Sequence, residues 1–188
     1  MEDGRNLLLT HRNQRYDLIT VELTTIWFSG ATNLYSKEFY ELARARLAPD
    51  GVLQQWVQLH RIGPNEIASA IATARSVFPY VSYSTYAGAG MMLAANRPFT
   101  ISSERIAYLA AQFQAGEGLS ADRARNLVEK LSEGELLSPA GVDALIAGTK
   151  PIINTDHNRY IEYATPKYAS SERDWRAYNI PYLASWNR

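Results

Sequence analysis

The segment Tyr16–Leu23 (YDLITVEL) constrains the fold more than any other feature of this sequence. It is rich in apolar and β-branched side chains and lacks the strict apolar–polar alternation of a strand with one face in water. The segment therefore predicts a buried strand that lies inside a sheet.

A helix and a second strand are expected next. Ser36 is a suitable N-cap, and Glu38 stands where its charge favours the positive end of the helix dipole. We expect this helix to run to about Leu47 and to be stopped by Pro49-Asp50-Gly51. Residues 52–59 then predict the second strand.

The following segments predict one more helix and a hairpin. Apolar residues at helical spacing, with Pro64 at the start, predict a helix over residues 64–78. Residues 81–86 and 91–95 predict strands joined by the short segment Ala87–Gly90, so this pair is expected to be antiparallel. Strands separated by helices favour parallel pairing. The fold class predicted is α/β, with a mixed sheet and flanking helices.

The second half of the chain has a different pattern. Residues 102–148 predict only helices, the last of them opened by a Ser138 cap and Pro139. Residues 159–164 predict a short strand, followed by an aromatic tail expected to pack on the domain. This divides the chain into an α/β domain (1–100), a small helical insert (101–150), and a closing strand with the tail (151–188).

Composition excludes several classes of function. Nineteen Lys and Arg balance nineteen Asp and Glu, so no net field favours a nucleic acid or an anionic membrane. The absence of cysteine removes disulfides and thiolate sites. His11, His60 and His157 lack metal-ligand spacing, so no metal site is expected. Without a signal peptide or a long apolar stretch, we expect a soluble, cytoplasmic chain.

Glu22 is the first candidate for chemistry. Ligands of open parallel sheets bind at the carboxyl ends of strands, and Glu22 follows the apolar part of the first predicted strand. A carboxylate there can accept a proton or hold an ammonium group. Spacing alone leaves the alternative open that Glu22 caps a helix or faces water.

An ordered set of residues resembles the spermidine synthase family, and in particular bacterial spermidine synthase-like proteins. The resemblance covers residues 3–95, and residues 154–166 are similar to that group's closing strand. The matching residues are Tyr16-Asp17-Leu18-Ile19-Thr20-Val21-Glu22, Trp27, Gly30, Asn33-Leu34-Tyr35, Glu38-Phe39-Tyr40, Leu47-Ala48-Pro49-Asp50-Gly51-Val52 and Gln55-Trp56.

The resemblance implies a partial Rossmann-like fold of the S-adenosylmethionine-dependent methyltransferase type. It also implies aminopropyl transfer from decarboxylated S-adenosylmethionine to a polyamine. A primary amine is protonated at neutral pH, because its pKa lies near 10.4 as in lysine, and it attacks only after losing that proton. The family's acid for this step corresponds to Glu22. A second family acid, which grips the diamine, is replaced here by the neutral Thr25, which bears on the identity of the acceptor.

Other site residues are implied by the same resemblance. Asp3-Gly4-Arg5 is similar to a turn whose aspartate contacts adenine, so Asp3 and Gly4 are candidates for cofactor binding, with an exposed turn as the alternative. Tyr86 resembles a tyrosine of the polyamine pocket, with core packing as the alternative. Trp27 and Gln55 are further candidates for substrate binding. Gln55 cannot share a strand face with Gln54 or Gln58, because successive residues of a strand point to opposite faces.

The family's glycine-rich turn and three further strands would precede Asp3, and the chain as given does not contain them. We therefore expect the carboxyl half of such an enzyme, which pairs through the first strand with a complementing half, with a second copy, or with its own rearranged N-terminal segment. Two alternatives stay open: a catalytically silent oligomeric or interaction module, and a methyltransferase of the same fold that uses S-adenosylmethionine.

Overall fold

The segment Tyr16–Val21 forms strand β1, and β2 (Leu47–Trp56) pairs with it in parallel. The computed structural model describes residues 3–23, 26, 28, 30–86, 88–98, 102–123, 125–126 and 135–187. The sheet has five strands in the order β1-β2-β4-β3-β5, and all pairs except β1–β2 are antiparallel. The other strands are β3 (Tyr80–Tyr86), β4 (Ala89–Ala95) and β5 (Glu135–Leu137). The predicted mixed α/β fold is confirmed.

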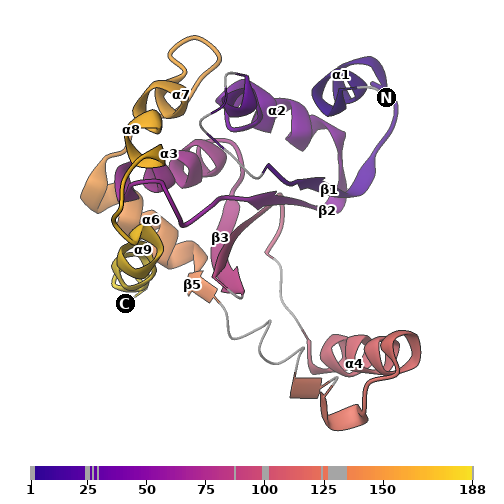
Figure 1. Ribbon diagram of the computed structural model, residues 1–188. Coiled ribbons are helices and arrows are strands. Elements are labelled where there is room, and N and C mark those ends of the chain that lie inside the picture. The colour runs from indigo at the N-terminus through magenta and orange to yellow at the C-terminus, as the bar shows by residue number, and fades with distance from the viewer. Residues whose placement is uncertain are drawn as a thin grey trace.

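Helices cover this sheet, as Figure 1 shows. Their caps follow the predicted chemistry: the Ser36 hydroxyl accepts from the Phe39 amide at 3.2 Å, and Ser138 does the same for the Gly141 amide. The helices are α1 (Gly4–Thr10), η1 (a 3₁₀ helix, Ala31–Leu34), α2 (Lys37–Arg46), α3 (Pro64–Arg75), α4 (Ser103–Glu117), α6 (Pro139–Thr149), α7 (Tyr160–Ala164), α8 (Pro166–Ala169) and α9 (Trp175–Ala184).

The junction of α2 and β2 differs from the prediction. Pro49-Asp50-Gly51 does not follow the helix as a turn but lies within β2, which begins at Leu47 and ends at Trp56. The β1–β2 register shifts here, since Tyr16 pairs with Leu47 but Leu18 pairs with Val52. A proline is tolerated at such an irregularity because the ladder does not need its missing N–H. The strand therefore begins and ends earlier in the chain than the expected range of residues 52–59.

The predicted hairpin is confirmed, but it enters the sheet in an order that the sequence did not indicate. β4 lies between β2 and β3, so Val52 pairs with Ala95 and Tyr80 pairs with the same Ala95 from the other side. Gly88 has φ +78°, a conformation that favours glycine in the tight turn. Helix α3 thus joins two strands that are not neighbours.

The expected strand over residues 159–164 is wrong, because the segment forms α7. Arg159 has φ +44°, and the Asn154 side chain accepts a hydrogen bond from the Ile161 amide at 3.1 Å. This side-chain cap satisfies a backbone donor at the start of a helix, where a strand would need a neighbouring chain. The closing strand of the 151–188 segment is therefore replaced by helices.

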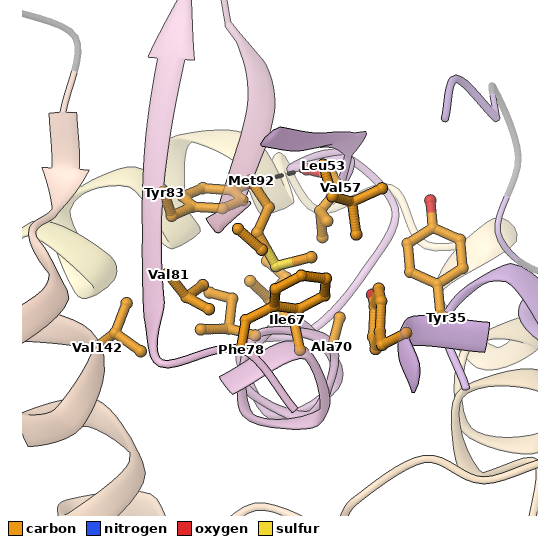
Figure 2. Close-up of a cluster of buried hydrophobic side chains, with 14 of the residues drawn as sticks. Tyr35, Leu53, Val57, Ile67, Ala70, Phe78, Val81, Tyr83, Met92 and Val142 are labelled. Atoms are coloured by element: carbon orange, nitrogen blue, oxygen red, sulfur yellow. Dashed lines mark hydrogen bonds between the residues drawn. The ribbon is translucent and has the colours of Figure 1, made fainter. Parts of the chain in front are cut away.

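The core lies between α3 and the sheet. Ile67 and Ala70 of α3 pack with Phe78, Tyr83 and Met92, and all of them are buried (Figure 2). Val142 and Leu145 of α6 belong to the same core, so α6 is packed against α3 although it lies in the predicted insert. In Figure 1, α4 stands away from the sheet. The domain boundaries stay a prediction.

The aromatic tail packs on the domain as expected. Tyr182 and Trp186 lie against the core, and the Trp186 ring covers Gly148 of α6. The neighbouring rings from Tyr168 to Trp186 contact one another in sequence. None of the described helices is long and apolar enough to cross a bilayer.

β1 occupies an edge of the sheet rather than its interior. Among the described strands it pairs with β2 alone, and the Leu18 side chain is 55% exposed. The prediction that Tyr16–Leu23 lies inside the sheet is therefore wrong within the described part of the chain, where one edge of β1 has no strand beside it.

Candidate functional site

A cavity of about 340 Å³ lies between α1, β1 and the start of α2. Its lining is mostly apolar and includes Leu8, Ile19, Leu34 and Phe39. Glu22, which is exposed, follows β1 and lines the same cavity. A carboxylate at the carboxyl end of a strand thus stands beside an apolar space large enough for part of a small ligand.

Arg5 is the second charged residue that lines this cavity among the described residues. Its guanidinium donates from Nη1 to the Asp156 Oδ1 at 3.1 Å and from Nη2 to Oδ2, and Nη1 also donates to the Asn33 carbonyl at 3.0 Å. The hydrogen bond from Arg5 lowers the pKa of the Asp156 carboxyl, as the charged form accepts both bonds. A bidentate ion pair therefore holds the guanidinium.

Further polar contacts hold the segment around Asp156 in place. The backbone amide of Asp156 donates to the Glu38 carboxylate at 2.9 Å. The Thr32 hydroxyl donates to the Glu162 carboxylate at 2.8 Å, and the side-chain amide of Asn154 donates to the Tyr35 carbonyl at 3.1 Å. Residues 154–162 thus pack against η1 and the start of α2.

Asp3 and Gly4 lie at the N-terminus of α1. The Asp3 side chain accepts a hydrogen bond from the Asn6 amide at 3.0 Å and so serves as the N-cap. Gly4 lines the cavity, and a Cβ built at this glycine would meet no atom within 4 Å. The start of α1 therefore leaves open space beside the cavity.

Gln55 lies in the core instead of at the cavity. Its side chain is fully buried, accepts from the Tyr40 hydroxyl at 2.7 Å, and donates to the Leu34 carbonyl at 2.8 Å. Burial raises the pKa of the Tyr40 phenol well above its usual value, so the hydroxyl keeps its proton and donates. Both polar groups of Gln55 are used in joining β2 to α2 and η1.

The remaining candidates are only partly described. Thr25 and Trp27 lie outside the described residues, and Tyr86 ends β3 with its side chain outside them. The structure therefore brings Asp3, Gly4 and Glu22 to one region and keeps Gln55 apart.

Sequence reasoning missed Arg5 and Asp156 as site residues. They are 151 positions apart, so no periodic pattern relates them. The only available signal was that Arg5 continues the Asp3-Gly4 turn and that Asp156 belongs to the late segment of the resemblance. In the described part of the chain, no cluster of three or more acidic or histidine side chains suits a metal ion.

Comparisons with known proteins identify relatives of the first half of the chain. A model of the spermine/spermidine synthase domain matches residues 1–93. The polyamine aminopropyltransferase of Nitrosomonas europaea is 35% identical over 85 residues, which is 43% of this chain and 26% of that protein. A crystal structure of a probable spermidine synthase from Corynebacterium glutamicum has a TM-score of 0.46 and 16% identity, over 70% of this chain and 51% of that one. Through its residues 1–93, the chain belongs to the spermine/spermidine synthase family.

Proposed function

We propose that the chain carries the acceptor side of an aminopropyltransferase, with decarboxylated S-adenosylmethionine as donor and a polyamine as acceptor. The observation that supports this most is the Glu22 carboxylate beside the cavity at the carboxyl end of β1. Membership of the family supports the reaction class. The match spans about a quarter of the curated relative, so activity, substrates and partners are proposals here.

In this mechanism Glu22 is the general base. The carboxylate holds the acceptor ammonium and removes one proton, which frees the nitrogen lone pair. The nitrogen attacks the aminopropyl carbon that is bonded to the donor's sulfonium sulfur, a C–N bond forms, and the C–S bond breaks. The electron pair of that bond stays on sulfur, so a neutral adenosyl thioether leaves.

Asp3 and Gly4 would hold the adenine of the donor. One carboxylate oxygen of Asp3 caps α1, and the space beside Gly4 is open to the ring. We propose that further donor contacts come from a partner unit that pairs with the free edge of β1, either a complementing half or a second copy. Unsatisfied donors and acceptors along such an apolar edge favour strand addition.

The acceptor is proposed to bind through fewer charged contacts than a diamine gripped by two acids. Thr25 is neutral at the position of the family's second acid, and Glu22 is the one carboxylate that lines the cavity among the described residues. The lining is otherwise mostly apolar apart from Arg5, which suits the methylene chain of a polyamine.

Replacement of Glu22 by glutamine tests this function. The chain, combined with a family donor-binding half, is incubated with decarboxylated S-adenosylmethionine and a set of polyamines, and products are identified by mass spectrometry. Glu22→Gln is expected to lower the rate by roughly 10²- to 10⁴-fold, the usual contribution of a general base. Glu41→Gln is the control, since Glu41 is exposed on α2, where it pairs with Lys37, and it does not line the cavity.

An unchanged rate for Glu22→Gln would remove Glu22 from the mechanism. Product formed only when S-adenosylmethionine replaces the decarboxylated donor would establish methyl transfer instead. No product from either donor with the complemented chain would favour the silent interaction module.

A further inference from the structure

The ion pair between Arg5 and Asp156 joins the cavity to the carboxyl-terminal part of the chain. Arg5 comes from α1 and lines the cavity, whereas Asp156 comes from the segment before α7. Two guanidinium nitrogens contact the two carboxylate oxygens, and the side chains are 22% and 38% exposed. This fork geometry is the strongest that an arginine and a carboxylate form.

The charge of Arg5 matters because Glu22 lines the same space. Both charges therefore act on a ligand that occupies the cavity, and added salt screens this effect. An unpaired guanidinium there would repel an ammonium group and would offer Glu22 a competing partner.

We propose that Asp156 is a positioning residue that neutralises Arg5, so that Glu22 sets the charge of the cavity and a cationic acceptor is preferred. This inference rests on the proposed function and extends it to acceptor specificity. Asp156 acts through Arg5 and does not itself contact the acceptor.

The other charges around the pair leave this balance in place. The Glu38 carboxylate accepts from the Asp156 amide, and Arg159 lies close enough to act on the Asp156 carboxyl. These two charges have opposite signs. Loss of the Asp156 charge alone therefore leaves one excess positive charge beside the cavity.

Three forms of the full chain test the proposal by calorimetry with 1,4-diaminobutane. Asp156→Asn is expected to weaken binding about 2- to 20-fold, the range that Coulomb's law gives for an ammonium group roughly 9 Å from an unpaired guanidinium at effective dielectric constants of about 80 to 20. The double variant Arg5→Gln/Asp156→Asn removes both charges and is expected to restore affinity to within about twofold. If the pair merely fixes residues 154–162, the double variant would bind as weakly as Asp156→Asn, and the proposal would be overturned.

A second measurement does not depend on any acceptor. A cationic carbodiimide with glycine ethyl ester labels exposed carboxylates, and peptide mass spectrometry gives the labelling rate of Glu22. This rate is expected to fall in Asp156→Asn and to recover in the double variant. Equal rates in Asp156→Asn and the unmodified chain would overturn the proposal.

Asp143→Asn is the matched control. It breaks the contact of Asp143 with Arg75, whose Nε lies 2.8 Å from Oδ1, and neither residue lines the cavity. Neither measurement should change. If the unmodified chain does not bind the diamine, the proposed acceptor class fails, while the carbodiimide rates still decide the role of Asp156.

Discussion

Removal of the Tyr40 hydroxyl would measure whether Gln55 is a structural residue. In Tyr40→Phe, the Gln55 carbonyl oxygen loses the donor that now lies 2.7 Å away. Both side chains are fully buried, so water cannot replace that donor without opening the contact between α2 and β2. A buried acceptor left without a partner costs about 1–3 kcal/mol, and we expect unfolding free energy to fall by that amount.

Urea unfolding followed by circular dichroism gives this free energy. Tyr163→Phe is the control, because Tyr163 is 75% exposed and its hydroxyl is in water, so its change should stay within about 0.5 kcal/mol. Gln55→Leu and the double variant Tyr40→Phe/Gln55→Leu complete a cycle, in which the two changes should be strongly non-additive.

A fall in unfolding free energy of less than about 0.5 kcal/mol in Tyr40→Phe would refute the argument, since a buried amide oxygen without a donor destabilises the fold by more than that. Additive effects in the cycle would refute the pairing itself.

Three further predictions follow from the structure. Arg5 lowers the pKa of Asp156 in the folded chain, so this carboxyl stabilises the fold above its unfolded pKa of about 3.9 and loses that effect as pH falls through the folded value; Arg5→Gln should raise the Asp156 pKa measured by carboxyl NMR. Gly90→Ala should destabilise by about 1–3 kcal/mol or more in urea, because the new Cβ would overlap the Tyr83 hydroxyl and the Val57 carbonyl oxygen, whereas Gly4→Ala meets open space and should change little. Hydrogen exchange combined with light scattering should show a self-associated chain with amides protected along the whole of β1; a monodisperse monomer whose outward amides exchange quickly would contradict edge pairing.

Local chemistry determined several elements from the sequence alone. Ser36 and Ser138 accept from the amide three residues on, which is a property of the helix end and needs no distant partner. The short connection between Tyr86 and Ala89 likewise fixes the β3–β4 hairpin, because two strands so close in sequence can pair only in antiparallel fashion. The family was also readable, since its residues are local and ordered along residues 1–93.

Only the tertiary structure decided what depends on contacts between distant segments. The insertion of β4 between β2 and β3 and the edge position of β1 follow from how strands pair across the sheet. Residues 159–164 alternate as a strand would, yet the Asn154 side chain caps them as a helix. The alternation of side chains along a strand predicts that Gln55 lies on the face opposite Gln54. It does not predict that the Gln55 side chain forms hydrogen bonds with the Tyr40 hydroxyl and the Leu34 carbonyl. Arg5 and Asp156 meet across 151 positions because the chain folds the late segment onto η1, and no local propensity encodes that meeting.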